Sequence, residues 1–265
     1  LQRGAPMMFL KATEIRTLDK RMILERRCPG MALMNRAGLA VAQVIAQVAA
    51  VRNERRRVTC VIGKGNNGGD ALVAARNLFE SGWPVGVLMT CLPAKLEGDA
   101  REAWTDLHRA GIPHLVLADA SDWEEAAGDG RDAASLPLTG IVVDGLLGTG
   151  GHGAPSGVTA AAVRWIRAAR KRALVVAVDI PSGVDADSGD VAGDAVCADI
   201  TVTFAYPKTG FLNPVAQSHI GHVVVADIGI HADLAAAAEQ AADDAVQMIA
   251  APGLNRLLPG RPEFA

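Results

Sequence analysis

The sequence lacks the cysteine spacing and the excess of positive charge that mark several protein classes. Its 265 residues include only four cysteines, which are widely scattered and form no C-x-x-C pair. Neither a zinc ribbon nor a thioredoxin-type motif is therefore expected. The formal net charge is −3, which argues against a broad electrostatic grip on nucleic acid or on an anionic lipid surface. We expect no nucleic acid and no membrane among its partners.

The sequence also lacks a secretory signal and a long uninterrupted apolar segment. The first residues, LQRGAPMMFLKATE, contain no sustained apolar core of a signal peptide. The most apolar long segment, Ala37–Val51, is interrupted by Gln43 and Gln47 and is too short to cross a bilayer. We predict a soluble, cytoplasmic protein.

Short apolar runs of strand length recur along the chain. They cover residues 58–62, 85–89, 114–118, 141–144, 173–180, 200–205 and 222–228. Several are apolar throughout, which is typical of parallel strands that are covered on both faces. Because helical patterns separate many of them, we predict an α/β fold, a three-layer αβα sandwich with a Rossmann-like, mostly parallel central sheet.

Helical spacing also predicts the domain boundaries. Segments with this spacing cover residues 12–27, 31–51, 69–81, 97–110 and 157–170, whereas residues 119–140 indicate a polar surface connection with at most one short helix. Residues 1–10 are interpreted as an N-terminal extension or a cloning remnant. Residues 11–250 would form the domain, and the Pro- and Gly-punctuated residues 251–265 a linker.

Four loops rich in Gly and Asp follow predicted strands. They cover residues 63–70, 144–157, 179–190 and 205–214. In a doubly wound sheet, ligands bind beyond the carboxyl ends of the strands. Each loop alone could be a surface turn, but four at one edge favour a binding site.

The first loop fits the G-x-G-x-x-G dinucleotide pattern at Gly63–Gly68. An NAD-dependent oxidoreductase would also need an acidic residue at the end of the second strand, and the sequence there, VLMTCLPAK, contains none. No G-x-x-x-x-G-K-[ST] motif occurs, which excludes a P-loop. Asn66, Asn67 and Asp70 would instead suit neutral polar groups of a ligand. The alternative for Asp70 is an interaction with the helix dipole.

Three further loop features indicate chemistry. Glycines between Gly145 and Gly157 offer successive backbone N–H groups that can cradle a phosphate. His152 in this loop is given no catalytic role. Asp179 ends a very apolar strand, where burial would raise its pKa toward a value useful for proton transfer. The alternative is that Asp179 only caps a turn.

Oxygen-bearing side chains at this edge also suggest a cation site. Asn67, Asp144 and Ser182 offer a carboxamide oxygen, a carboxylate and a hydroxyl from three loops. Hard cations prefer such all-oxygen ligation. One carboxylate among neutral oxygens favours a monovalent ion.

The motifs GKGNNGGDALVAARNL, VVDGLLGTG, VAVDIPSGVDADSG and TVTFAYPKTG, in this order, resemble the YjeF N-terminal domain family. The resemblance runs from about residue 12 to residue 230. It implies a homodimeric isomerase, an NAD(P)H-hydrate epimerase that interconverts the R and S epimers of hydrated NADH or NADPH for cofactor repair. It also implies a bound potassium ion.

The resemblance implies roles for individual residues. Potassium would be held by Asn67, Asp144 and Ser182. Substrate would be bound by Asn66, Asn67, Gly68, Gly69, Asp70, Gly148, Thr149, Gly150, Gly151, His152, Gly153, Ala154 and Asp179. Asp179 would contact the reacting ring, and we hypothesise that it transfers the proton. Lys208, at the same edge, is a candidate for phosphate contact or electrostatic stabilisation, with a solvated lysine as the alternative.

Relatives of this family suggest further partners and one rival function. The domain is fused in many bacteria to an ADP- or ATP-dependent dehydratase, and residues 251–265 resemble the linker toward that domain, which this chain would lack. Other relatives are non-catalytic nucleotide- or protein-binding modules of the same fold. Intact loop residues favour the enzyme.

Overall fold

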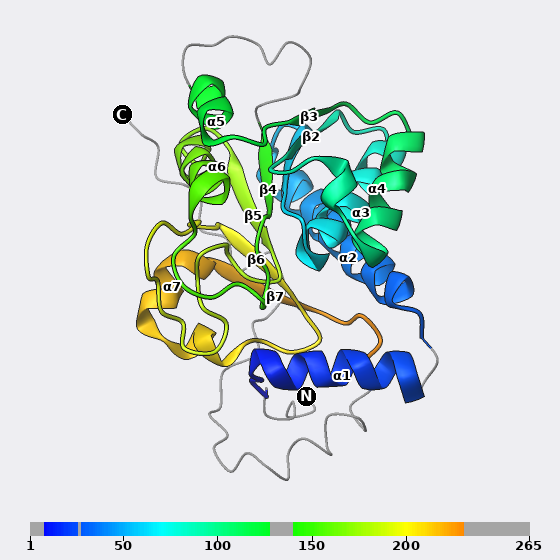
Figure 1. The fold of residues 1–265 in the computed structure, drawn as a ribbon, viewed down its shortest axis with the longest axis vertical. Coiled ribbons are helices and arrows are strands. Elements are labelled where there is room, and N and C mark those ends of the chain that lie inside the picture. The colour runs from blue at the N-terminus through cyan, green and yellow to red at the C-terminus, as the bar shows by residue number, and fades with distance from the viewer. Residues whose placement is uncertain (1–7, 26–27, 128–139, 231–265) are drawn as a thin grey trace.

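The computed structural model describes residues 8–25, 28–127 and 140–230, and a single parallel sheet runs through them (Figure 1). The strands are β1 (Val58–Ile62), β2 (Val85–Met89), β3 (His114–Val116), β4 (Ile141–Gly145), β5 (Leu174–Val178), β6 (Ile200–Phe204) and β7 (His222–Ala226). Their order is β3-β2-β1-β4-β5-β6-β7, and every pairing is parallel. The predicted strands are thereby confirmed, and the sheet is parallel throughout the described residues.

Helices cover both faces of the sheet. They are α1 (Ala12–Glu25), α2 (Gly30–Arg52), α3 (Asn66–Glu80), α4 (Gly98–Arg109), α5 (Ala120–Ala127), α6 (Gly157–Ala169) and α7 (Pro214–Ile220), with short 3-10 turns η1 (Pro93–Lys95) and η2 (Thr209–Leu212). α2, α3 and α4 lie on one side, and α5 and α6 on the other (Figure 1). The predicted three-layer αβα sandwich is confirmed.

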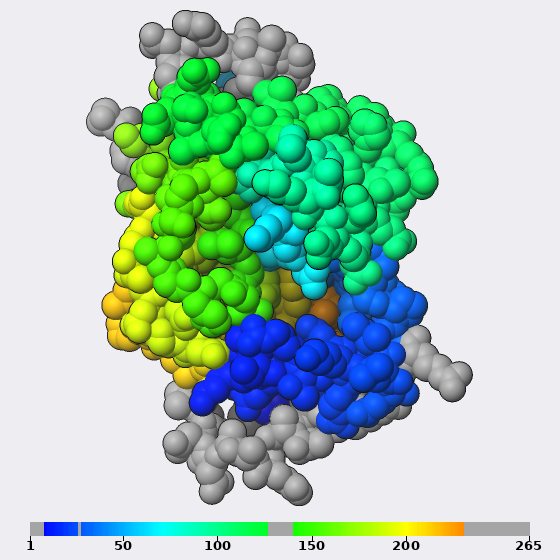
Figure 2. All heavy atoms as spheres, in the orientation of Figure 1, coloured from blue at the N-terminus to red at the C-terminus, as the bar shows by residue number. Residues whose placement is uncertain are grey.

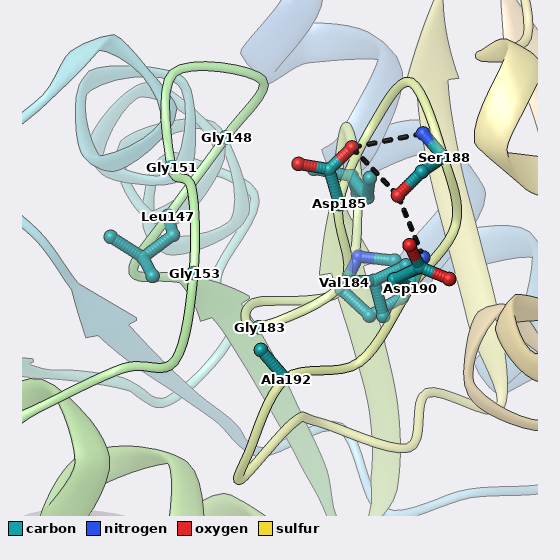
Figure 3. A pocket seen from close by; sticks show the side chains of 12 residues that line it. Leu147, Gly148, Gly151, Gly153, Gly183, Val184, Asp185, Ser188, Asp190 and Ala192 are labelled. Carbon is teal, nitrogen blue, oxygen red and sulfur yellow. Dashed lines mark hydrogen bonds between the residues drawn. The ribbon is translucent and has the colours of Figure 1, made fainter.

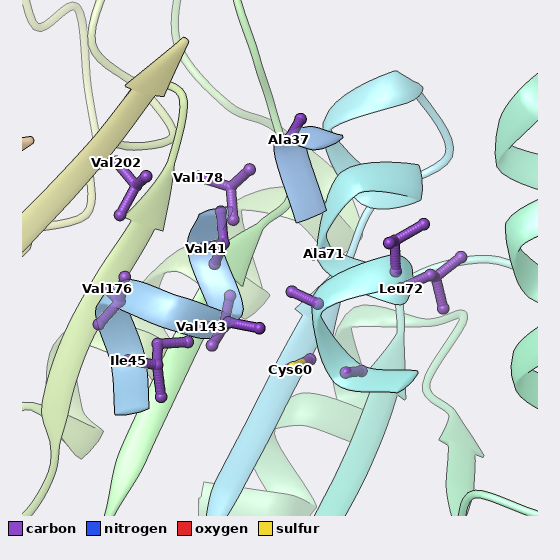
Figure 4. Packing of buried hydrophobic residues seen from close by; sticks show 14 of the residues in the cluster. Ala37, Val41, Ile45, Cys60, Ala71, Leu72, Val143, Val176, Val178 and Val202 are labelled. Carbon is purple, nitrogen blue, oxygen red and sulfur yellow. The ribbon is translucent and has the colours of Figure 1, made fainter. Parts of the chain in front are cut away.

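Alternating strand residues feed two separate cores. Cys60, Val143 and Val176 pack with Val41 and Ile45 of α2 in the larger cluster (Figure 4). Their strand neighbours point to the opposite face and pack against α5 and α6. Burial raises the pKa of the Cys60 thiol to about 12, so this cysteine is inert at neutral pH.

The helix α2 is longer than the apolar segment that the sequence suggests. Its 23 residues are long and apolar enough to cross a membrane by length and composition alone, whereas the predicted segment 37–51 covers only part of the helix. Half of its most apolar window is buried inside the protein. Buried Val41, Ile45 and Val48 belong to the larger core, as in a helix that packs on a sheet.

α1 crosses the carboxyl edge of the sheet (Figure 1). The Leu10 N–H donates to the Pro207 carbonyl at 3.0 Å, and the Thr209 N–H donates to the Leu10 carbonyl at 3.1 Å. The Ala12 N–H donates to Asp187 Oδ1 at 2.6 Å. Arg16 Nη1 donates to the Thr149 carbonyl at 3.2 Å. The helix is thus tied to the loops that follow β4, β5 and β6.

Two parts of the prediction have a different outcome. α7 was not predicted, because seven residues show too little periodicity; Asn213 caps it by accepting a hydrogen bond from the Val215 N–H. The domain boundaries at residues 10 and 250 stay predictions. The predicted linker, residues 251–265, lies outside the described residues.

Candidate functional site

The strand order reverses between β1 and β4, and the loops after these strands begin the site. From β1 the chain proceeds outward through β2 to β3, whereas from β4 it proceeds the other way to β7. At such a switch point the loops diverge and leave a crevice beyond the strand ends. Figure 2 shows a hollow above α1, bordered by cyan and green atoms and floored by yellow and orange ones.

Asn67 lies at this crevice, inside the first turn of α3. The sequence suggested a loop through residue 68, but the helix begins at Asn66. The low helix propensity of the glycines in its first turn explains why the sequence pattern does not reveal this start. Asn67 Nδ2 donates to the Leu147 carbonyl at 2.9 Å. The residue is only 7% exposed, and its side-chain oxygen, Oδ1, is buried and accepts no hydrogen bond from any described residue. Buried acceptors without a partner are costly, so this atom is suited to binding a ligand.

Asp144 and Ser182 join the loops after β4 and β5. The Ser182 hydroxyl donates to Asp144 Oδ1 at 2.7 Å, and the Ser182 N–H donates to Oδ2 at 2.8 Å. The Leu147 N–H donates to the Ser182 hydroxyl at 2.9 Å. Asp144 is fully buried, and burial raises its pKa to about 6 against the opposing effect of these hydrogen bonds. A cation beside this carboxylate would favour its charged form.

Asp179 and Lys208 form a buried ion pair at the ends of β5 and β6. Lys208 is fully buried, and its ammonium contacts Asp179 Oδ1 and donates to Thr203 Oγ1 at 2.8 Å. A weaker donation reaches the Tyr206 carbonyl at 3.5 Å. The alternative of a solvated lysine is therefore wrong. The Asp179 side chain is 14% exposed, so it keeps an open side.

The backbone turns sharply where the Asp179 and Lys208 segments leave the sheet. Asp179 has φ 65° and Ala205 has φ 58°, both in the left-handed region. Non-glycine residues adopt this conformation rarely, and such residues gather at functional sites. The Asp179 N–H donates to the Val202 carbonyl at 2.7 Å, which holds the turn in place.

Two further carboxyl groups act on this ion pair. Asp70 is partly buried; burial, then the charges of Asp179 and Asp19, raise its pKa well above the usual value. Burial and the charge of Asp179 raise the pKa of Asp19 to about 6, against the opposing effect of Lys208. Sequence reasoning missed Asp19. The available signal was a carboxylate within the apolar stripe of α1.

The glycine-rich loop borders a pocket of about 220 Å³ (Figure 3). Gly148, Gly151 and Gly153 face the segment 180–192 across this pocket. His152 is 62% exposed, and its Nδ1 lies 3.2 Å from Asp185 Oδ2. Hydrogen bonds from Ser188, opposed by burial and supported by His152, lower the pKa of Asp185, so its carboxylate is charged at neutral pH.

Residues 30–210 match the family described as YjeF-related protein N-terminus. The chain belongs to this family. A protein of Rhodopirellula baltica named NAD(P)H-hydrate epimerase is 36% identical over 220 residues, which cover 83% of this chain and 84% of its own length. A protein of Pirellula staleyi with the same name is 38% identical over 215 residues, which cover 81% of this chain and 89% of that protein.

Other similar proteins differ in length or in identity. The chain spans 42% of a Moorella thermoacetica protein named Bifunctional NAD(P)H-hydrate repair enzyme Nnr, with 38% identity over 230 residues, or 87% of this chain. The crystal structure of a yeast protein superposes with a TM-score of 0.65 at 22% identity, covering 83% of this chain and 87% of that one. At this identity the likeness shows the fold alone.

Proposed function

We propose that the protein is an NAD(P)H-hydrate epimerase, an isomerase that interconverts the R and S epimers of hydrated NADH and NADPH. The observation that carries the proposal is the similarity, over four fifths of the chain, to proteins named for this activity. The buried pair of Asp179 and Lys208 at the crevice supports it. Such a pair offers a fixed carboxylate for proton transfer beside a fixed positive charge.

The reacting carbon bears a hydroxyl and adjoins the ring nitrogen, and Asp179 would exchange a proton there. It inverts when the hydroxyl leaves and returns on the other face, or when the ring opens and closes. Both routes need a group that gives and takes a proton. The left-handed turn at Asp179 and the contact with Lys208 fix the direction of this carboxylate.

Potassium is the cofactor we propose, on the basis of the donor atoms. Asn67 Oδ1 is a buried oxygen without a partner, and the Asp144 carboxylate, the Ser182 hydroxyl and the Leu147 carbonyl are joined to one another or to Asn67. These are oxygens with a single formal charge, which fits a monovalent hard cation. Bound there, the ion would supply positive charge and hold the three loops together.

The remaining predicted substrate contacts fit a ligand whose damaged ring lies in the crevice and whose phosphate lies at the glycine-rich loop. Asn66–Asp70 and Asp179 would surround the damaged ring, because these residues border the crevice. Gly148–Ala154 would bind phosphate through backbone N–H groups, since the loop is glycine-rich and largely exposed. Lys208 would act through Asp179, because its ammonium is buried away from any phosphate.

Two rival functions have less support. The crevice would suit an oxidoreductase only with an acidic residue after β2, where Thr90 instead donates its hydroxyl to the Ile62 carbonyl at 3.0 Å. A non-catalytic binding module of the same fold would not need a buried lysine against Asp179. Neither rival explains the acidic residues gathered at that pair.

The deciding experiment uses the purified chain and a pure R hydrate. Formation of the S epimer is followed by chromatography, with and without potassium, against the spontaneous rate. The expected result is epimerisation well above this baseline that potassium increases. A rate equal to the baseline under both conditions would refute the enzyme.

The setting of the enzyme is also a proposal. We expect a cytoplasmic homodimer, which equilibrium sedimentation would test. We also expect a fused or associated dehydratase that uses ADP or ATP, as the bifunctional relatives suggest. Co-purification of the two activities from the source cells would support that association.

A further inference from the structure

One carboxylate interrupts the buried stripe of α1. Ala12, Ile15 and Met22 are buried, and Asp19 lies four residues after Ile15 and three before Met22, so it shares their face. That face is directed at the carboxyl edge of the sheet. Within the described residues, no hydrogen bond or ion pair to the Asp19 carboxylate is present. It is a partly buried acid without a local structural partner.

The charged groups that face Asp19 come from three other elements. The charge of Asp179, after β5, disfavours ionisation of Asp19, whereas Lys208, after β6, favours it. Asp70 on α3 is affected by Asp19, Asp179 and Lys208, and more weakly by Asp99 of α4. Three carboxyl groups therefore interact electrostatically with one buried ammonium, which among the described residues forms an ion pair only with Asp179.

A separate feature indicates that this edge receives a ligand. Asn67, one turn before Asp70 on α3, has a buried Oδ1 that accepts no hydrogen bond. The hollow in Figure 2 lies directly above α1, the helix that carries Asp19. The hollow therefore borders the helix that carries Asp19, the unsatisfied acceptor lies on the helix that carries Asp70, and both acids are partly buried, unlike a solvated acidic patch.

On the route in which the hydroxyl leaves and water returns, inversion needs proton transfer on both faces of the ring. The oxygen that leaves one face takes up a proton, and the water that arrives at the other face gives one up. A single carboxylate on one face cannot reach both oxygens. Asp179 therefore needs a second group.

We propose that Asp19 is this second proton-transfer residue, a catalytic residue that α1 contributes opposite Asp179. The proposal rests on the proposed function. The Asp19 carboxyl gives its proton to the hydroxyl, the C–O bond breaks with its electron pair on oxygen, and water leaves. The nitrogen lone pair forms a C=N bond. Water then adds to the other face, the π pair returns to nitrogen, and Asp179 accepts the released proton.

The two carboxyl groups are suited to these different roles. Asp179 is in contact with the Lys208 ammonium, which holds its carboxylate in a fixed position. Asp19 has a pKa raised to about 6 by burial and by Asp179, so it is partly protonated near neutral pH and can act as the acid. In the reverse direction the roles are exchanged.

The test compares Asp19→Asn, Asp19→Glu and the wild type for R-to-S conversion across pH 5 to 9. Lys20→Gln, on the exposed face of α1, is the matched control. We expect Asp19→Asn to lower kcat by roughly 10²–10⁴-fold with KM changed less than about threefold. The limb of the wild-type pH profile near pH 6 should disappear. Asp19→Glu should recover most of the rate with a displaced limb, and Lys20→Gln should match the wild type.

Several results would overturn the assignment. A kcat for Asp19→Asn within about threefold of the wild type would do so, and so would an equal loss at every pH with the limb retained. If Asp19→Asn fails to fold, Asp19→Glu decides, because an unmoved limb would exclude Asp19 as the titrating group. An inactive wild type would instead refute the proposed function itself, which separates the two failures.

Discussion

At the scale of single residues, substitution of either Asp179 or Lys208 should destabilise the fold, because the other partner of the contact stays in place. Lys208 is fully buried, and within the part of the chain that the structure describes its ammonium contacts one carboxylate, that of Asp179. Removal of one partner of a buried pair leaves an uncompensated charge and typically costs about 3–5 kcal/mol. Loss of activity and loss of stability are therefore mixed in any single substitution at this pair.

A double variant separates the two effects. Asp179→Asn should lower epimerisation by roughly 10²–10⁴-fold and destabilise the fold by about 3–5 kcal/mol. Asp179→Asn combined with Lys208→Met should recover most of the stability and none of the activity. Urea unfolding and the epimerisation assay measure the two quantities. Recovery of activity in the double variant would remove Asp179 from the mechanism.

Asp19 should show the opposite relation between activity and stability. Its folded-state pKa, about 6, lies above the ordinary value of 3.8, so the folded protein binds this proton more tightly than the unfolded chain does. The stability contributed by protonated Asp19 is present below about pH 4 and is lost as the pH rises to about 6.

Asp19→Asn should therefore stabilise the fold at pH 8 by about 1–3 kcal/mol, and this gain should vanish at pH 4. Denaturant unfolding at the two pH values measures it. The variant would be more stable and less active, as expected of a residue kept for function. A loss of stability at pH 8 would show that burial does not dominate the environment of Asp19.

At the scale of elements, the G-x-G-x-x-G pattern serves packing at two of its three glycines. A Cβ on Gly68 would overlap the Gly63 carbonyl, and a Cβ on Gly63 would overlap the Leu146 carbonyl. A Cβ on Gly65 would meet nothing within 4 Å. The close approach of α3 to the ends of β1 and β4 thus explains why the pattern occurs without a ribose-binding acid.

A matched pair of substitutions tests this reading. Gly68→Ala should destabilise the fold by about 1–3 kcal/mol or more through overpacking. Gly65→Ala, three residues away, should cost less than about 1 kcal/mol, because it removes only a glycine helix cap in an extended conformation. Thermal melting compares them. Equal costs would mean that backbone flexibility, and not space, selects glycine here.

Most elements and their order along the chain could be predicted from the sequence, whereas α7, the order of the strands in the sheet and the side-chain partners could not. Parallel strands buried on both faces are apolar throughout, so VTCVI and VGVLM identify β1 and β2 directly. The convergence of the loops follows from the topology. The burial of Lys208 and the position of Asp19 depend on how residues far apart in sequence meet, and no local pattern records that.

At the scale of the whole molecule, a cation at Asn67, Asp144 and Ser182 would join three loops. Binding to the folded state alone raises stability by about 1–3 kcal/mol when the ion is well above its dissociation constant. Potassium chloride should therefore raise the melting temperature over lithium chloride at equal ionic strength. Asn67→Ala should abolish this difference, and Asn66→Ala, at an exposed neighbour, should retain it. An equal response of both variants would contradict the assigned donors.

The bridge between Leu10 and Lys208 has a consequence for biosynthesis. The helix that carries Asp19 leaves the ribosome before any strand of the sheet, yet the last of the three loops to which it is tied is made after six of the strands. The nascent domain therefore carries Asp19, Asp70 and Asp179 before it has Lys208. Completion of the docking of α1 and neutralisation of Asp179 both require the segment that carries Lys208, which is made after β6. Catalytic competence should then appear in one step, near the end of translation of the domain.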